Sequence, residues 1–199
     1  MSAILPSINF TPDPALAKHF MLHQVHWIEA EDAIHAQHKQ AFALAEKSVR
    51  IGWTYADAFK NVRKRLRFPN RHYIFATKDY PSALEYMNQV YDFAELFNLT
   101  GSIVSRGEES LNVSRPGPDG AKTSFTDEVK IGTIKFDTGS RIIAFSSNPY
   151  AMSVYGGDVG LDEFARRPAR IRSFLKSLIL LGIDQISLQY INLLPERMT

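Results

Sequence analysis

The sequence predicts an α/β domain in which a mainly parallel sheet is flanked by helices. Two observations predict this class. Short β-rich runs alternate with longer segments of helical periodicity, which is the order of parallel strands joined by crossover helices. The chain has 199 residues, 45% of them hydrophobic and 22% charged, so it is long enough for one domain with its own core.

The first half of the chain supplies most of this alternation. The segments are, in order, a helical region over 15–45 whose end at 42–47 can also be a short buried strand, a helix over 54–67, a strand over 72–77 and a helix over 82–97. Gly52 precedes the second helix, Asn70 interrupts the chain after it, and Pro81 opens the third in its first turn.

The second half continues with shorter β-rich runs. Residues 106–126 are rich in Gly, Pro and Ser and predict a surface loop or a hairpin excursion. Strands over 130–136 and 141–146 are joined by the turn 137–140, and 157–162 predicts a shorter strand. In a sheet of this kind, ligands bind at the carboxyl ends of the strands.

Composition excludes several classes of protein. There is no cysteine, which excludes a disulfide framework, a thiolate zinc site and a cysteine nucleophile. The N-terminus has no basic segment followed by an apolar one, and the longest apolar stretch, around Leu178 to Ile183, is too short to span a bilayer. We therefore expect a soluble, cytoplasmic protein without a membrane partner.

Basic residues are clustered although the net charge is only +2. Residues 60–72 hold six basic side chains and no acid, and a second cluster spans Arg166 to Lys176. Such clusters either neutralise nucleic-acid phosphates or form a solvated helix face, and both interpretations stay open at this point.

Histidines suggest a metal site only weakly. His19, His23 and His26 share one helical face, but no cysteine or well-placed carboxylate completes a ligand set, so a polar helix face is favoured over zinc. A Ser-His-Asp triad is not favoured either, because the sequence has no G-x-S-x-G elbow.

The junction between the strand ending near residue 47 and the helix from 54 resembles a phosphate-binding loop. The pattern G-x-x-x-x-G-K-[ST] places backbone N–H groups around phosphates and a hydroxyl on Mg²⁺. With Gly52 as its second glycine, Thr54 supplies the hydroxyl, while Lys47 takes the place of the first glycine and Trp53 that of the lysine. An ordinary strand-to-helix turn would share this local pattern.

A pair of carboxylates follows the short strand about 110 residues later. Successive side chains at a strand end point in different directions, so Asp162 can hold Mg²⁺ while Glu163 faces a water molecule. Two solvated acids after a turn are the alternative, and Gly160 interrupts the apolar run that precedes them.

Three segments together resemble the ATPase domain of large terminase subunits of tailed bacteriophages, particularly those of Mu-like prophages. They are Glu46 to Ala56, the HYIFATKDYPSALEYMNQV stretch from His72, and Gly139 to Pro149 continuing into Gly156 to Ala165. Terminases commonly carry a variant loop, K-S-x-R-x-G-x-[ST], which this sequence matches over Lys47 to Thr54. The resemblance covers roughly residues 20–166 and implies a P-loop NTPase fold of the RecA/ASCE type.

The resemblance also implies a function and a set of site residues. The implied function is Mg²⁺-dependent ATP hydrolysis that drives double-stranded DNA into a procapsid, with a portal protein, a small terminase subunit and further copies of the chain as partners. The implied nucleotide-binding residues are Lys47, Ser48, Arg50, Gly52, Trp53, Thr54 and, on the adenine side, Gln24. Thr54 and Asp162 would hold Mg²⁺, and Glu163 would activate the attacking water.

The sequence departs from the family in two places. Ser153 stands where an arginine is usual before the carboxylate pair. In the family, a further strand with a Ser/Thr-rich motif and a nuclease domain follow the ATPase core, and neither is visible in the sequence. We therefore expect an adenine-side helical segment over 1–40, an ATPase core over 41–166, a divergent helical tail over 167–199, and a domain that is truncated at its C-terminus and has no nuclease.

Two alternatives to an active motor remain from the sequence. One is a degenerate prophage remnant that binds partners or DNA without ATP turnover. The other is an unrelated nucleic-acid-binding α/β protein that uses its basic helices.

Overall fold

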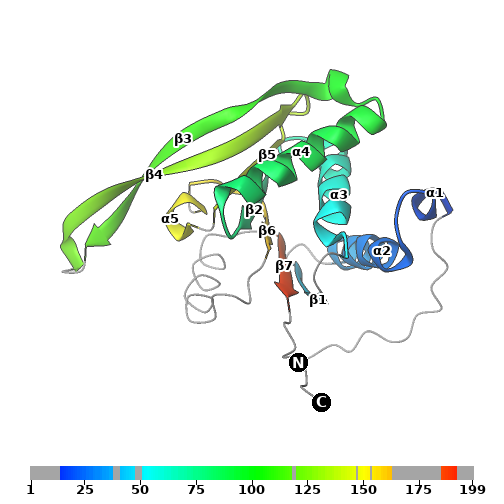
Figure 1. The fold of residues 1–199 in the computed structure, drawn as a ribbon, viewed down its shortest axis with the longest axis horizontal. Helices are drawn as coiled ribbons and strands as arrows, with labels where there is room; N and C mark the ends of the chain where they lie inside the picture. The colour runs from blue at the N-terminus through cyan, green and yellow to red at the C-terminus, as the bar shows by residue number, and fades with distance from the viewer. Residues whose placement is uncertain are drawn as a thin grey trace, which may run out of the picture.

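One sheet runs through the computed structural model, which describes residues 14–37, 41–47, 51–117, 120–146, 148–152, 154–162 and 185–191 (Figure 1). Within these residues the sheet has seven strands in the order β1-β7-β6-β2-β5-β4-β3. Their bounds are Ala41–Lys47 (β1), Tyr73–Thr77 (β2), Ile103–Gly117 (β3), Gly120–Phe136 (β4), Arg141–Ser146 (β5), Asp158–Leu161 (β6) and Gln185–Ile191 (β7). Strands β1, β7, β6, β2 and β5 run parallel, and β4 is antiparallel to both β5 and β3. The prediction of an α/β domain with a mainly parallel sheet is confirmed.

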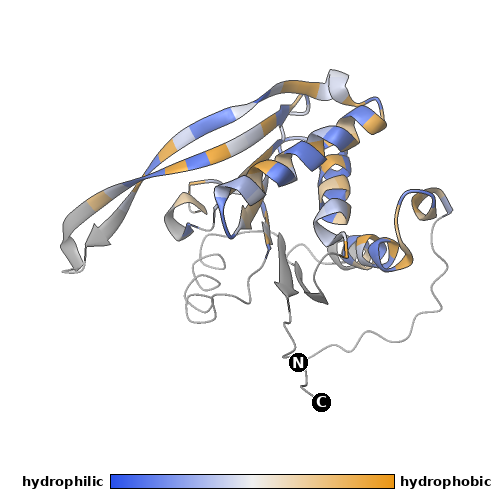
Figure 2. Ribbon diagram, in the orientation of Figure 1, coloured by the Kyte–Doolittle hydropathy of each residue, from blue (hydrophilic) through white to orange (hydrophobic). Residues whose placement is uncertain are grey.

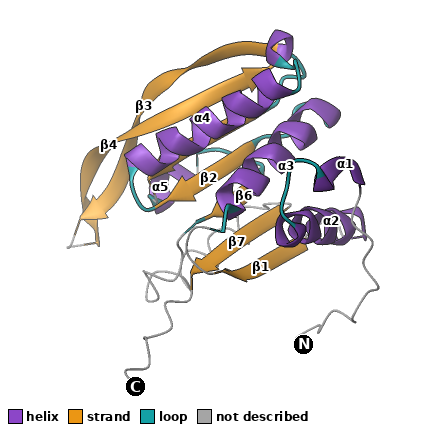
Figure 3. Cartoon of the chain, turned by 45° about the vertical axis from the view of Figure 1, so that its right-hand side comes forward, coloured by secondary structure: helices purple, strands orange, loops and turns teal. Residues whose placement is uncertain are grey.

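Helices cover both faces of the parallel part of the sheet. They are α1 (Pro14–Ala17), α2 (Leu22–Gln37), α3 (Trp53–Arg67), α4 (Tyr80–Leu96) and α5 (Pro149–Met152), with a 3-10 turn η1 at Thr100–Ser102. Figure 3 shows α3 and α4 side by side over the sheet, with α2 next to α3. None of the described helices combines the length and apolar character that a bilayer span needs.

Alternating residues of β2 show how the two faces are divided. Tyr73 and Phe75 join the core formed with α2, α3 and α4, whereas Ile74 and Ala76 join the core on the face that carries α5. All five residues of β2 are buried, as expected for a strand covered on both sides.

The starts of the helices follow from local sequence. The Asp79 side chain accepts a hydrogen bond from the Ser82 N–H at 2.9 Å and caps α4, and Pro81 lies in the first turn as predicted. At the start of α3, Gly52 has a left-handed backbone with φ of 69°.

The predicted excursion over 106–126 is a hairpin rather than a loop. Strands β3 and β4 pair over most of their length, and hydrophilic and hydrophobic residues alternate along the described part of the ribbon (Figure 2). On one face of the ribbon, Val113, Val129 and Ile131 pack with Ala151 and Met152 around α5. Beyond this point the two strands extend away from the body (Figure 1).

The expectation for the C-terminal region needs a correction. The sequence predicted a helical tail over 167–199 and no further strand, but residues 185–191 form β7 inside the sheet, between β1 and β6. The sequence of this segment, QISLQYI, alternates polar and apolar residues, which is the period of a strand, and it pairs with distant strands on both sides. The division of the chain into 1–40, 41–166 and 167–199 otherwise stays a prediction. The strand interpretation of 42–47 is confirmed, since β1 spans Ala41–Lys47.

Candidate functional site

The carboxyl ends of the parallel strands bring the two predicted motifs to one edge of the sheet. Leu44, Leu188 and Leu161 lie in one row across β1, β7 and β6. Lys47, the last residue of β1, and Asp162, which follows β6, both lie past this row. The Asp162 N–H donates to the Ala76 carbonyl at 3.0 Å and so extends the sheet beyond β6.

Thr54 and Asp162 are in contact at this edge. The Thr54 hydroxyl donates to a carboxylate oxygen of Asp162 at 3.4 Å, although the two residues are 108 positions apart in the chain. Both side chains are half-buried, so they remain accessible to a ligand. A hydroxyl and a carboxylate are hard oxygen donors, which Mg²⁺ prefers, and in nucleotide sites Mg²⁺ takes only one or two protein ligands besides phosphate and water. The pair therefore fits the magnesium role that the resemblance implies.

The backbone before Thr54 is shaped by Gly52. Its positive φ is a conformation that L side chains rarely adopt, and a Cβ atom there would lie 2.4 Å from Nε2 of Gln24. The Ala56 N–H donates to the Gly52 carbonyl at 3.2 Å, so the N–H groups of the first helical turn remain at the free end of α3. Such an N-terminus favours anions.

Gln24 is buried against this turn and holds it through its side-chain amide. Its Oε1 accepts from the Met21 N–H at 2.9 Å, and its Nε2 donates to the carbonyls of Gly52 at 2.7 Å and Ile51 at 3.3 Å. The Nε2 atom of His23 donates to the same Ile51 carbonyl at 2.9 Å. The segment at the start of α2 is therefore tied to the loop by two side chains.

Trp53, at the place of the usual P-loop lysine, points into the protein. Its indole is buried against Trp27 of α2, with ring centroids 4.6 Å apart, and Ile51 packs on the pair. Only the backbone of Trp53 is left to face a ligand, so a cation for the phosphates would have to come from another residue of the loop.

Three predicted site residues, Ser48, Arg50 and Glu163, lie outside the described part of the chain. Ser153, which stands where the family usually has an arginine, lies outside it as well. Lys47 is placed by its backbone at the end of β1. Their proposed roles therefore rest on the sequence.

Two histidines of the predicted helical face contact other groups of the protein. His19 packs edge-on against the Phe97 ring, with centroids 5.7 Å apart, while His23 is bonded to the loop. Among the described residues there is no group of three or more His, Cys, Asp or Glu side chains placed to hold a metal ion.

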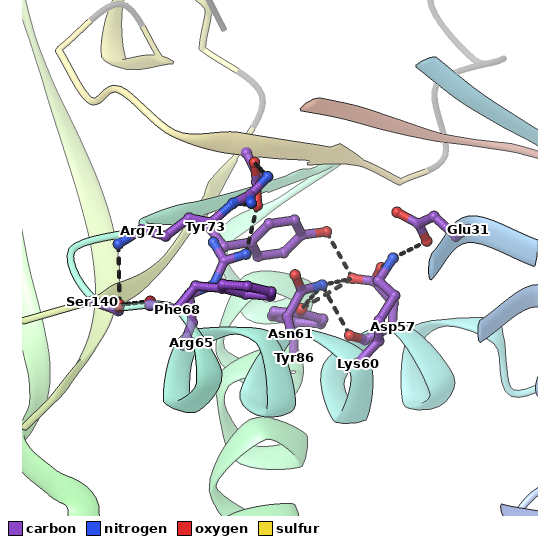
Figure 4. Close-up of polar contacts among 11 residues, drawn as sticks. Glu31, Asp57, Lys60, Asn61, Arg65, Phe68, Arg71, Tyr73, Tyr86 and Ser140 are labelled. Carbon is purple, nitrogen blue, oxygen red and sulfur yellow. Dashed lines mark hydrogen bonds and ion pairs between the residues drawn. The ribbon is translucent and has the colours of Figure 1, made fainter. Parts of the chain in front are cut away.

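Beneath the edge, a buried polar network joins α3 to its neighbours, and sequence reasoning missed it (Figure 4). Asp57 of α3 accepts hydrogen bonds from Tyr73 at 2.8 Å and Tyr86 at 3.0 Å, and Lys60 lies 2.9 Å from its other oxygen and also pairs with Glu31 of α2. Burial lowers the pKa of Lys60, but the charges of Asp57 and Glu31 outweigh it and the pKa is raised, so the ammonium stays charged. Burial and then the Asp57 charge raise the pKa values of both tyrosines well above their usual range, which keeps them as donors.

A second buried cluster centres on Asp158, at the amino end of β6. Arg65 donates to it at 2.6 Å, and Arg71 donates to both of its oxygens at 2.8 and 2.9 Å. Burial raises the pKa of Asp158, but hydrogen bonding to Arg71 and the charges of the two arginines outweigh it, and the pKa is lowered. Near the same amino end, the Ser140 hydroxyl accepts from the Arg71 N–H at 3.1 Å and donates to the Phe68 carbonyl at 2.9 Å.

These two clusters contain most of the ion-pair partners of the basic residues in 60–72. Lys60 and Arg65 are fully buried in ion pairs, and Lys64 is buried as well. Arg63 pairs with Asp32, and Arg71 pairs with Asp158. Lys60, Lys64 and Arg65 are therefore internal, and neither of the two interpretations from sequence describes them, whereas Arg63 and Arg71 are half-buried and Arg67 is exposed.

The spacing of the missed residues was a usable signal. Asp57, Lys60, Asn61 and Lys64 recur at positions i, i+3, i+4 and i+7 and so form one stripe on α3. A polar stripe usually faces solvent. Here it faces acids and tyrosines supplied by other elements, which the stripe itself does not reveal.

The chain is similar to known proteins in structure and not in sequence. No protein-family model matches the chain, and no curated protein matches it in sequence. The large terminase of a thermophilic bacteriophage superposes with a TM-score of 0.51 at 14% identity, over 86% of this chain and 38% of that one. This chain has the fold of a phage large-terminase ATPase domain.

The terminase-like domain is thus a P-loop NTPase fold, as the resemblance implied. The large-terminase ATPase domain of a Thermus phage is also similar, with a TM-score of 0.46 and 13% identity over 82% of this chain and 64% of that one. The chain spans well under half of the length of the first of these two proteins.

Proposed function

We propose that the terminase-like domain binds ATP with Mg²⁺ at the carboxyl edge of the sheet and hydrolyses it to drive DNA packaging. The observation that carries the proposal is the hydrogen bond between Thr54 and Asp162, because it joins the hydroxyl of one motif to the carboxylate of the other across the fold. Two independent local patterns, each weak alone, meet at the place where nucleotides bind in such sheets.

Each residue at the edge has a task in this proposal. Backbone N–H groups of Gly52 and Trp53 receive phosphate oxygens at the start of α3, where the helix dipole favours negative charge. Thr54 and Asp162 would hold Mg²⁺, which when bound would supply positive charge beside the phosphates.

The remaining roles come from the loop residues and the acid after Asp162. Lys47 and Arg50, with Ser48, contact the phosphates and replace the cation that Trp53 does not supply. Glu163 accepts a proton from the attacking water. Catalysis of this type depends mainly on positioning and electrostatics, so a lysine at the other end of the loop suffices if its ammonium reaches the phosphates.

The wider function follows from the family. We propose that the partners are double-stranded DNA, a portal protein, a small terminase subunit and further copies of the chain, and that the domain acts in the cytoplasm of a bacterial host. The first basic cluster contributes little to DNA contact in this proposal, because four of its six basic side chains, Lys60, Arg63, Arg65 and Arg71, form ion pairs within the chain.

The proposal is tested by phosphate release from ATP in the presence and absence of Mg²⁺. Wild type should turn ATP over only with Mg²⁺, Glu163→Gln should bind ATP without turnover, and Lys47→Ala should bind it weakly. Gln89→Ala on α4 serves as a control for handling and folding. Binding of ATP by wild type without any turnover would instead favour the alternative, a nucleotide- or partner-binding module derived from such a domain.

A further inference from the structure

The side-chain amide of Gln24 has a fixed orientation. Its Oε1 atom accepts a hydrogen bond from the N–H of Met21, the residue before α2, and so caps the start of that helix. Its Nε2 atom donates to the carbonyls of Ile51 and Gly52. Rotating the amide by half a turn would place Nε2 against an N–H and Oε1 against two carbonyls. The orientation is therefore determined by its partners.

This arrangement occupies the amide nitrogen of Gln24. The side chain is only 5% exposed, and its Nε2 atom lies within hydrogen-bond distance of two loop carbonyls, at 2.7 and 3.3 Å. A glutamine that reads adenine needs its amide donor and acceptor for the base. Gln24 has no donor left for a base unless it releases the loop.

The two carbonyls determine where the neighbouring N–H groups point. In a planar trans peptide the C=O and N–H bonds point in opposite directions. Holding the Ile51 carbonyl toward α2 turns the Gly52 N–H away from α2, and holding the Gly52 carbonyl toward Gln24 and Ala56 turns the Trp53 N–H out of the helix end. These are the two N–H groups assigned above to phosphate.

We infer that Gln24 is a positioning residue that presets the phosphate-binding N–H groups of the loop, and that it does not read the base. The inference rests on the proposed nucleotide function and assigns Gln24 to the triphosphate end of the ligand rather than to its base. The clash that any Cβ at Gly52 would make with Nε2 of Gln24 shows how closely the two residues fit.

The test compares three ligands that share a triphosphate and differ in the base. Affinities of the full chain for ATP, GTP and inorganic tripolyphosphate, each with Mg²⁺, are measured by calorimetry for wild type, Gln24→Ala, Gln24→Glu and the control Gln89→Ala. Gln24→Glu keeps the acceptor for Met21 but removes both donors, so it separates the capping of α2 from the holding of the loop.

Both Gln24 variants lose the hydrogen bonds that preset the loop, so their affinity for each of the three ligands should be about tenfold lower than that of wild type. The ratio of the ATP and GTP affinities should stay unchanged, and Gln89→Ala should bind like wild type. A lower affinity for ATP alone, with the affinities for GTP and tripolyphosphate unchanged, would show that Gln24 reads adenine and would overturn the inference.

A second measurement needs no ligand. The sequence has two tryptophans, and both lie at this loop, where Trp53 directly follows Gly52 and packs on Trp27. Acrylamide should quench their fluorescence more strongly in both Gln24 variants than in wild type, while far-UV circular dichroism stays the same. Equal quenching would refute the role of Gln24 in holding the loop. If wild type binds none of the three ligands, the nucleotide function fails, and the quenching result still decides whether Gln24 holds the loop.

Discussion

Replacing Lys60 by methionine tests the buried network most severely. The Lys60 ammonium lies between Glu31 and Asp57, and all three side chains are at most 1% exposed. The substitution keeps the aliphatic stem but leaves two buried carboxylates without their cation. Removing one partner of a buried ion pair costs about 3–5 kcal/mol, a large share of the roughly 5–15 kcal/mol that stabilises a domain.

The structure places the expected loss toward the lower end of this range. Asp57 keeps the hydrogen bonds from Tyr73 and Tyr86 and a third from Asn61 at 3.1 Å. We therefore expect Lys60→Met to lower the free energy of unfolding by about 3 kcal/mol at pH 8.

Urea denaturation followed by tryptophan fluorescence at pH 8 measures this loss. Arg67→Met, at an exposed position of the same helix, is the matched control and should change the free energy of unfolding by less than about 0.5 kcal/mol. A Lys60→Met protein within about 1 kcal/mol of wild type at pH 8 would show that the network is hydrated rather than buried, and the reasoning would fail.

Three further predictions concern neighbouring residues. Gly160→Ala should cost more than about 2 kcal/mol, because its Cβ would lie 1.8 Å from the Tyr73 hydroxyl, whereas Gly107→Ala, with nothing within 4 Å, should be close to neutral by the same denaturation assay. Tyr73→Phe removes a 2.8 Å bond to a buried carboxylate and should cost about 1.5–3 kcal/mol, and a loss below about 0.5 kcal/mol would contradict the geometry. Burial, and next the charge of Lys60, lower the pKa of Lys64 to about 7. The unfolded chain then binds one more proton than the folded one between about pH 7 and pH 10.5, so stability should rise with pH in this window by up to about 1.4 kcal/mol per unit, and Lys64→Met should remove that rise.

Sequence reasoning predicted which strand ends carry the two short motifs. The resemblance implied that Thr54 and Asp162 act together, and the structure brings their side chains into contact. Parallel strands share one carboxyl edge, so residues far apart in the chain meet there without further information. Lys47, which the sequence places at the end of a short buried strand, is the last residue of β1 and so lies toward the same edge.

What the sequence could not predict depends on partners from distant elements. The polar stripe of α3 is buried because Glu31, Tyr73 and Tyr86 come from α2, β2 and α4 to meet it. The strand β7 lies between β1 and β6. Its sequence, QISLQYI, alternates polar and apolar residues as a strand does, but its place in the sheet depends on pairing with distant strands. Gly160 seemed to interrupt a strand, but it makes room for the Tyr73 hydroxyl.

The most direct test of the account is calorimetric titration of ATP with and without Mg²⁺ into wild type, Thr54→Ala and Asp162→Asn. If Thr54 and Asp162 form a magnesium site, wild type should bind ATP at least tenfold more tightly with Mg²⁺ than with a chelator. Both variants should lose this enhancement while keeping similar affinity for metal-free ATP. Wild-type binding that does not depend on Mg²⁺, or variants that respond to Mg²⁺ as wild type does, would contradict the account.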